Sequence, residues 1–162
     1  MILGITKRAI QREIFQDVKG TILGLAGPRP AEYLKVVGTN VILYENDPSL
    51  YKRVKPRIKV PYIYGDIQYA QPTEAIDLDL MRTGQVERDR ILHLFKKQIE
   101  TFSEALFVYT ICSRNNKNDL IKEISKIIKG FDANGNITIY RYREGAPMKT
   151  IKVWYTKMKR LQ

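Results

Sequence analysis

The sequence predicts an α/β protein with a mostly parallel sheet that ends in an antiparallel hairpin. Apolar runs at 21–27, 41–45, 60–66 and 75–79 each end in an acid or a glycine turn. Their length and their β-branched or aromatic content are typical of strands buried on both faces, as in a parallel sheet. Amphipathic helical segments separate these runs, whereas the last part of the chain alternates with period two. Together the patterns favour helices layered on a mixed sheet.

Helical periodicity and end signals place the helices between these runs. Pro30 suits a first helical turn and Gly38 suits a helix end. The run 46–48 opens a short helix and supplies an N-cap, and the basic segment 51–59 is expected to hold the end of that helix and a loop. The expected helices are 5–19, 31–37, the short segment after the N-cap, 86–102 and 120–128.

The second half of the chain adds a fifth buried strand and the hairpin. The fifth strand is expected over 105–111, and the hairpin strands over 137–143 and 149–155. At 162 residues the chain is long enough to bury a core without disulfides or metals. We expect one domain over 1–162, made of an N-terminal helix in 1–19, an alternating core in 20–130 and the terminal hairpin in 131–162.

The charge balance points to a polyanionic partner. Lys and Arg number 28 against 17 Asp and Glu, which gives a net charge of +11. Such an excess favours nucleic acid first and an anionic membrane surface second, although a generally basic protein is the plain alternative. No apolar run reaches the length of a membrane span and no signal peptide is recognisable, so we expect a cytoplasmic protein without a membrane partner.

Cysteine and histidine are too scarce for the usual metal sites. Cys112 and His93 are the single cysteine and the single histidine of the sequence. The chain therefore has no intrachain disulfide and no cluster of cysteine or histidine ligands. We expect no metal centre.

Acids at the ends of the predicted parallel strands indicate a polar crevice, because ligands of such sheets bind outside the carboxyl ends of the strands. Glu45 lies 21 residues after Gly24, where a carboxylate can accept hydrogen bonds from both ribose hydroxyls. Asp47 is the rival if the strand runs longer, and a plain helix-start charge is the alternative role. Asp77 and Asp79 share one side of an otherwise apolar strand, and their burial without partners would be costly. Function is therefore favoured over structural filling for this pair.

The order of the elements over roughly 20–158 resembles that of class I S-adenosylmethionine-dependent methyltransferases, particularly small viral or phage-type members. The run 23–28, Leu-Gly-Leu-Ala-Gly-Pro, stands where the family has its glycine-rich first turn, although Thr21 and Ile22 occupy the place of the usual acid. The resemblance implies a three-layer Rossmann-like sandwich with seven strands, one of them inserted antiparallel near the end. It also implies S-adenosyl-L-methionine as the cofactor, and the host cell cytoplasm as the location of a viral member.

The resemblance further assigns roles to individual residues. At the glycine turn, backbone close to the cofactor is expected at Gly24, Ala26 and Gly27. Asp66 is expected to accept a hydrogen bond from the adenine amine while Ile67 packs on the ring; a simple turn aspartate is the alternative. Asp79 is the expected catalytic residue, which orients the nucleophile or contacts the cofactor. Asp77 is expected either to contact the cofactor or to form a structural hydrogen bond. The remaining cofactor contact is Glu45. At the end of the fifth strand, Thr110, Ser113 and Arg114 are candidates to face the substrate, with an ordinary loop role as the alternative for each.

Basic residues interleaved with tyrosines form the expected nucleic-acid surface. Cations contact phosphates, and tyrosines such as Tyr62 and Tyr64 can stack on unpaired bases. A solvated charge run is the alternative for this segment. The expected nucleic-acid contacts are Lys52, Arg53, Lys55, Arg57 and Arg114.

The predicted function is methyl transfer to a nucleic acid or a nucleic-acid-associated protein. The sequence has no Asn/Asp-Pro-Pro-Tyr/Phe motif, no cysteine after a proline, no Gly-x-Gly-x-x-Gly and no Walker A lysine. These absences disfavour common amino-directed DNA methylation, base C5 methylation, nicotinamide chemistry and phosphate-loop nucleotide hydrolysis. A non-catalytic nucleic-acid-binding protein of the same fold and a structural homodimer remain the alternatives, and the methyl acceptor stays open.

Overall fold

A computed structural model of the chain describes residues 6–80, 84–112, 120–142 and 148–158. The strands are β1 (Ile22–Leu25), β2 (Val41–Glu45), β3 (Tyr62–Tyr64), β4 (Ala75–Asp79), β5 (Glu104–Cys112), β6 (Ala133–Arg141) and β7 (Met148–Lys157). The α-helices are α1 (Lys7–Phe15), α2 (Pro30–Val37), α3 (Pro48–Val54), α4 (Gln85–Thr101) and α5 (Ile121–Gly130). Two short 3₁₀ turns, η1 (Lys55–Arg57) and η2 (Ile67–Tyr69), follow α3 and β3.

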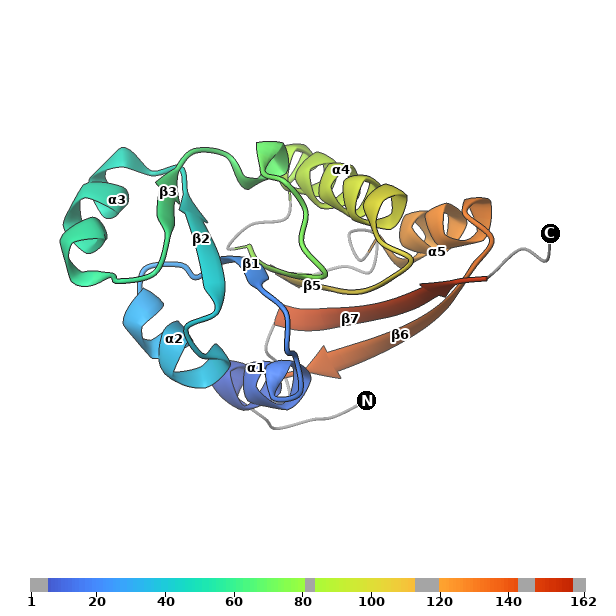
Figure 1. The fold of residues 1–162 in the computed structure, drawn as a ribbon, viewed down its shortest axis with the longest axis horizontal. Helices are drawn as coiled ribbons and strands as arrows, with labels where there is room; N and C mark the ends of the chain where they lie inside the picture. The colour runs from blue at the N-terminus through green and yellow to red at the C-terminus, as the bar shows by residue number, and fades with distance from the viewer. Residues whose placement is uncertain (1–5, 81–83, 113–119, 143–147, 159–162) are drawn as a thin grey trace.

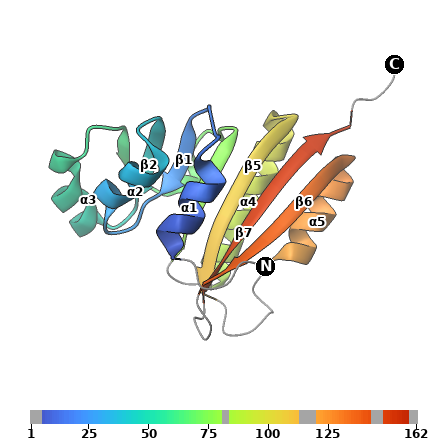
Figure 2. The same cartoon turned by 90° about the horizontal axis from the view of Figure 1, so that it is seen from below.

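All the strands join one seven-stranded sheet in the order β3-β2-β1-β4-β5-β7-β6. The strands from β3 to β5 are parallel, and β7 lies antiparallel between β5 and β6. Helices α1 and α2 lie on one face of the sheet, and α4 and α5 lie on the other (Figures 1 and 2). The expected three-layer sandwich with an inserted antiparallel strand is confirmed.

Successive side chains of β4 point to opposite faces of the sheet and so contribute to two separate parts of the core. Ile76 and Leu78 pack in the cluster that includes the buried side chains of α4 and α5. Ala75 packs in the second cluster, which includes Ile10 of α1 and Tyr33 of α2. Because successive side chains of a strand point to opposite faces, the two acids of β4 lie on the α1–α2 side. The carboxylates of Asp77 and Asp79 therefore lie beneath α1 and α2.

The hairpin differs most from its expected bounds. Strand β6 begins at Ala133, earlier than 137, because Asn134 and Gly135 continue the ladder opposite Thr156 and Tyr155. These residues pair through their backbone without the alternation of apolar and polar side chains by which a strand is recognised in a sequence. The predicted turn at 144–147 lies outside the described residues. Strand β3 is shorter than expected, because Asp66 leaves the sheet to cap η2.

Two further features bear on function. In the part of the chain that the structure describes, no helix combines the length and apolarity needed to cross a bilayer. The same residues contain no group of three or more His, Cys, Asp or Glu side chains placed to hold a metal ion.

Candidate functional site

A cavity among the described residues lies at the carboxyl ends of the parallel strands. Its volume of about 690 Å³ falls within the usual range of small-molecule sites. Strands β1, β2 and β4, the turn after β3 and the start of α4 all contribute to the wall. The polar and glycine positions that line it are Gly27, Glu45, Asn46, Asp47, Gly65, Asp66, Asp79, Gly84, Gln85, Glu87 and Arg90.

Five of the sequence-predicted cofactor and catalytic positions meet at this cavity. They are Gly27, Glu45, Asp66, Ile67 and Asp79. They meet because the carboxyl ends of parallel strands share one edge of the sheet.

Three predicted cofactor contacts do not line the cavity. Gly24 lies inside β1, where an added Cβ would come within 3.0 Å of the Tyr33 hydroxyl, so close packing explains this glycine. Ala26 is buried in the α1–α2 core, and Asp77 is only 1% exposed. The structure therefore places these residues beneath the site, and they support its walls.

Glu45 and Asp47 have separate tasks at the end of β2. Asp47 caps α3, since its Oδ1 accepts hydrogen bonds from the backbone N–H of Ser49 and of Leu50. Glu45 Oε2 accepts from the backbone N–H of Asp47 at 3.0 Å, which leaves Oε1 for a ligand. Burial raises the pKa of Glu45 more than this hydrogen bond lowers it. Glu45 is partly buried in the cavity wall, whereas Asp47 is exposed and caps α3, so Glu45 is the better candidate for a ligand-binding carboxylate.

Asp66 is held by Arg90 in a two-pronged ion pair. Nε and Nη2 of Arg90 donate to Oδ1 and Oδ2 of Asp66 at 2.9 and 3.1 Å. The backbone and side-chain N–H groups of Gln68 donate to the same two oxygens at 3.1 and 2.7 Å. Burial raises the pKa of Asp66, but these hydrogen bonds outweigh it, so the pKa lies below its ordinary value. Four donors match the roughly four acceptor sites of a carboxylate, so an adenine amine must replace one of them.

Asp79 is a buried carboxylate at the cavity wall. Its side chain is 2% exposed, and its Oδ2 forms an ion pair with Lys7 from α1. Among the described residues, its Oδ1 has no hydrogen-bond partner. Gly27 adjoins it in a left-handed conformation with φ of +71°, and an added Cβ would lie 3.9 Å from Asp79 Oδ2. The glycine therefore keeps this corner of the cavity open.

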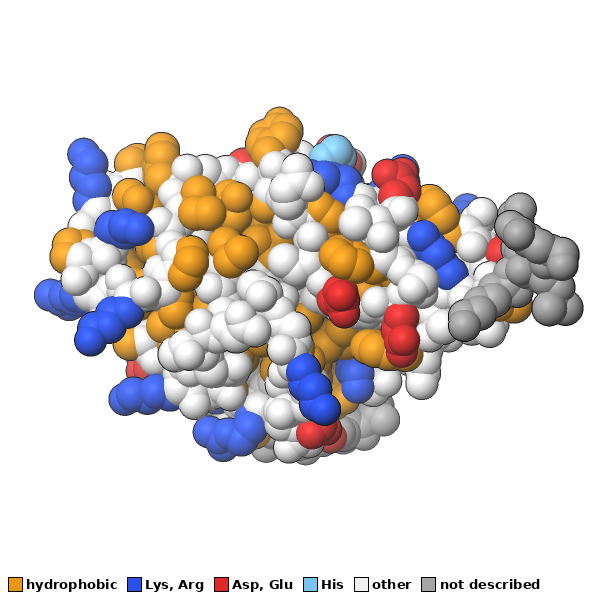
Figure 3. Space-filling model, viewed as in Figure 1, with side chains coloured by type: hydrophobic (Ala, Val, Ile, Leu, Met, Phe, Trp, Pro, Cys, Tyr) orange, Lys and Arg blue, Asp and Glu red, His pale blue; other side chains and the backbone are white. Residues whose placement is uncertain are grey.

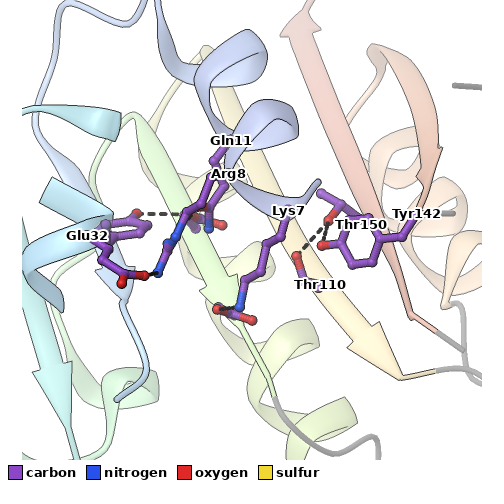
Figure 4. A network of polar contacts seen from close by, with 10 residues as sticks. Lys7, Arg8, Gln11, Glu32, Thr110, Tyr142 and Thr150 are labelled. Atoms are coloured by element: carbon purple, nitrogen blue, oxygen red, sulfur yellow. Dashed lines mark hydrogen bonds and ion pairs between the residues drawn. The ribbon is translucent and has the colours of Figure 1, made fainter. Parts of the chain in front are cut away.

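Asp77 lies one pleat deeper in β4, beneath α1 and α2. The Tyr33 hydroxyl donates to Asp77 Oδ2 at 2.9 Å, and the Arg8 guanidinium lies over the Tyr33 ring. Burial, followed by the negative charge of Asp79, raises the pKa of Asp77 to about 7. Figure 4 shows Lys7 and Arg8 extending from α1, and Arg8 ends beside Glu32, with which it forms an ion pair at 3.9 Å. The sequence indicated neither these cations nor Tyr33 and Arg90.

Thr110, expected at the substrate, is instead buried in a row of hydroxyl groups. Its Oγ1 is 2.8 Å from that of Thr150 on β7, which is 2.9 Å from the Tyr142 hydroxyl (Figure 4). Thr110 stands opposite Asp79 in the β4–β5 register and is 2% exposed. The row joins β5, β7 and the residue that follows β6, next to the site. The other two residues expected at the substrate, Ser113 and Arg114, lie outside the described residues.

The basic segment after β2 lies on the surface with tyrosines beside it. The tyrosines are in contact, because the rings of Tyr51 and Tyr62 stack at 5.3 Å and Tyr51 meets Tyr64 at 5.5 Å. Tyr64 is 53% exposed. Blue and orange side chains alternate over this end of the molecule, on the α3 side of Figure 3. We call Lys52, Arg53, Lys55, Arg57 and Lys59, all exposed, together with the partly exposed Tyr51 and the exposed Tyr64, the α3 patch. Tyr62, which was expected to stack on bases, is only 4% exposed and packs in the core.

Known proteins match this chain in fold and not in sequence. No family model and no curated protein matches the sequence. An rRNA methylase from Streptococcus thermophilus superposes with a TM-score of 0.61 at 11% identity, over 96% of this chain and 99% of its own. A glycopeptide N-methyltransferase complexed with S-adenosylmethionine gives 0.62 at 10% identity, over 93% and 94%. The TYW2 protein of M. jannaschii, in complex with S-adenosylmethionine, gives 0.61 at 11% identity, over 95% and 78%.

These likenesses establish the fold. The chain has the α/β fold of class I methyltransferases, as the sequence resemblance predicted. None of the three proteins is described as viral, so the narrower viral or phage-type expectation gains no support from them.

Proposed function

We propose that this protein is an S-adenosylmethionine-dependent methyltransferase that acts on a nucleic acid. The observation that carries the proposal is the cavity at the strand ends, where Gly27, Glu45 and Asp79 meet. S-adenosylmethionine carries a sulfonium and an ammonium group against one carboxylate, so a largely acidic wall suits it. The open corner at Gly27 also fits a ligand with hydrogen-bond donors, as does the Oδ1 of Asp79, which has no partner in the described part of the chain.

Different residues of the cavity contact different parts of the proposed ligand. Glu45 offers one carboxylate oxygen to the ribose hydroxyls, as acids in this position do in dinucleotide-binding folds. Asp66 and Arg90 form the wall at the base end, and Asp79 lies at the opposite end beside Gly27. Ile67, next to Asp66, is 1% exposed and supplies an apolar wall at the base end.

The expected chemistry relies on positioning. When bound, the cofactor supplies an electrophilic methyl group. The chain holds the acceptor in line with it and excludes water, which are the contributions that fixed geometry makes to such a transfer. Where the acceptor must lose a proton, an acid of the cavity wall takes it up.

The α3 patch supports a nucleic-acid acceptor. Cations bind phosphates without regard to sequence, and exposed tyrosines stack on unpaired bases. Helix α3 starts at the cavity, where Asn46, Asp47 and Leu50 line the wall, and ends at the patch. Its seven residues span about 10 Å, so a strand bound there reaches the cavity mouth within a few nucleotides.

Calorimetric titration with S-adenosylhomocysteine, the demethylated cofactor, tests the cofactor site. We expect the Glu45→Ala variant to bind about tenfold more weakly than the wild type, since a charged hydrogen bond contributes about 1.5–3 kcal/mol. The matched control is Glu13→Ala, which removes an exposed acid of α1. Both variants should unfold near the wild-type temperature. A loss of stability in Glu45→Ala without any change in affinity supports the rival, a non-catalytic nucleic-acid-binding protein.

A further inference from the structure

The first turn of α1 brings a cation to the carboxyl end of β4. Lys7 crosses from the helix to Asp79, and the two side chains form an ion pair (Figure 4). Thr6 fixes the start of the helix, because its hydroxyl accepts a hydrogen bond from the backbone N–H of Ala9. Ile10 and Ile14 hold the helix on the sheet, with exposures of 0% and 6%. Lys7 is thus held close to the cavity although its partner lies far along the sequence.

The two oxygens of Asp79 have unequal environments. Lys7 Nζ meets Oδ2, whereas Oδ1 has no hydrogen-bond partner among the described residues. A buried acceptor without a partner is costly, more so when it is charged. Asp79 belongs to the cavity wall, so a donor on a bound ligand can satisfy Oδ1. The missing partner points to a donor that arrives with the ligand.

The charges around Asp79 favour a cationic donor. Asp77 lies two residues away on the same face of β4 and adds a second acid, whose Oδ2 already accepts from Tyr33. Lys7 and Arg8 are the cations of α1 near the pair, but Arg8 hydrogen-bonds Gln11, lies over the Tyr33 ring and forms an ion pair with Glu32 at 3.9 Å. One ammonium group therefore directly neutralises Asp79, and that group occupies a single oxygen. Charge-assisted hydrogen bonds are stronger than neutral ones, so an ammonium group satisfies the open oxygen best.

We propose that Lys7 is a positioning residue: it holds Asp79 Oδ2, so that Oδ1 accepts a hydrogen bond from the α-ammonium group of the cofactor. The inference rests on the proposed cofactor and adds to it a residue from the N-terminal helix. It explains why a lysine from α1 reaches Asp79, which lines the cavity. It also predicts that the amino-acid end of the ligand, and not its nucleoside, depends on Lys7.

Two ligands separate these ends of the cofactor. S-adenosylhomocysteine carries the α-amino acid, whereas 5′-methylthioadenosine keeps the adenine, the ribose and the thioether but lacks that group. Calorimetry gives the affinity of each ligand for the wild type, for Lys7→Met and for Lys7→Arg. Arg12→Met is the matched control, because it removes an exposed cation from the same helix. The ratio of the two affinities within one protein does not depend on the fraction that is folded.

We expect Lys7→Met to bind S-adenosylhomocysteine about tenfold more weakly and 5′-methylthioadenosine within about twofold of the wild type. Lys7→Arg should recover most of the loss, and Arg12→Met should match the wild type. If Lys7→Met fails to fold, Asp79→Asn should show the same selective loss.

Other results overturn the inference. An equal loss for both ligands indicates a general structural role, and an unchanged affinity shows that Lys7 does not act on the ligand. Tighter binding of S-adenosylhomocysteine by Lys7→Met shows that Lys7 competes with the ligand for Asp79. A wild type that binds neither ligand overturns the proposed function as well, and that failure is visible before any variant is made.

Discussion

The Arg90 guanidinium donates hydrogen bonds to both oxygens of Asp66 at the cavity wall, at 2.9 and 3.1 Å. The Gln68 side chain adds a 2.7 Å hydrogen bond to Oδ2. Arg90 comes from α4 and Asp66 from the turn after β3, so the pair also ties the helix layer to the edge of the sheet. Asp66 therefore reaches a base amine only by exchanging a donor that it already has.

Gln68→Ala tests that exchange. The side chain of Gln68 is the most easily released of the four donors, since it is neutral and flexible. Its removal frees an acceptor site on Asp66, so we expect S-adenosylhomocysteine and 5′-methylthioadenosine both to bind roughly threefold more tightly, on the order of one neutral hydrogen bond. Calorimetry measures the change, with Gln16→Ala as the control at an exposed position. Unchanged affinities would mean that Asp66 does not accept from the base.

Asp77 should make the protein less stable as the pH rises. Its pKa is raised from 3.8 to about 7, so the folded state binds this proton more tightly than the unfolded state does. The free energy of unfolding therefore falls as the pH increases from about 4 to about 7. Asp77→Asn removes the titration and keeps an acceptor for Tyr33. Relative to the wild type, we expect the variant to gain about 2 kcal/mol between pH 5 and pH 8.

Urea unfolding of both proteins at the two pH values measures this difference. Because Asp79, Lys7 and Arg8 are present in both proteins, their own contributions largely cancel. Parallel stability curves would show that Asp77 is ionised in the folded protein throughout this range.

The α3 patch predicts a salt-dependent affinity for single strands. Removing one cation that binds a phosphate reduces the slope of log affinity against log salt by about 0.7 for a single strand. We expect Arg53→Gln and Arg57→Gln each to lower the slope by about that amount with a single-stranded RNA oligonucleotide, measured by fluorescence anisotropy. Tyr64→Ala should weaken binding by about 1 kcal/mol or more and leave the slope unchanged. Lys126→Gln, an exposed site on α5, is the control, and an equal effect there would indicate diffuse charge attraction.

Gly135 of β6 should resist any side chain. An added Cβ would lie 2.6 Å from Cδ1 of Ile128 on α5, which is too close for carbon atoms. We expect Gly135→Ala to destabilise the protein by about 1–2 kcal/mol through overpacking. Ile128→Val lacks Cδ1, so the double variant should lose less stability than the sum of the two single variants. Additive losses in thermal unfolding would contradict the close contact.

The sequence predicted the sheet well because its signal is local. Apolar runs and helical periodicity mark each element. Glu45, Asp66 and Asp79 line one cavity because parallel strands end at one edge of the sheet. The same reasoning could not separate Asp79 from Asp77, which share a face and differ by one pleat in depth. That depth decides which carboxylate lines the cavity and which one is covered by Tyr33.

The partners of these acids could not be predicted from local patterns. Lys7 and Arg90 lie on helices whose charged positions look like ordinary solvent-facing residues, and only helix docking brings them to Asp79 and Asp66. Gly24 was predicted to approach the cofactor, but a glycine near the end of a strand can make room for a ligand or for a neighbouring side chain, and the sequence does not distinguish the two. Here the neighbour is the Tyr33 hydroxyl.

An NMR titration of the wild-type protein with S-adenosylhomocysteine tests the central claim most directly. Gly27 and Gly65 line the cavity, and Gly135 lies in β6 away from its wall, so three backbone amides report on the site and on a distant control. The account predicts saturable one-to-one shifts of the Gly27 and Gly65 amides at submillimolar ligand, with Gly135 unmoved. A folded protein whose cavity amides do not shift at these concentrations would contradict it.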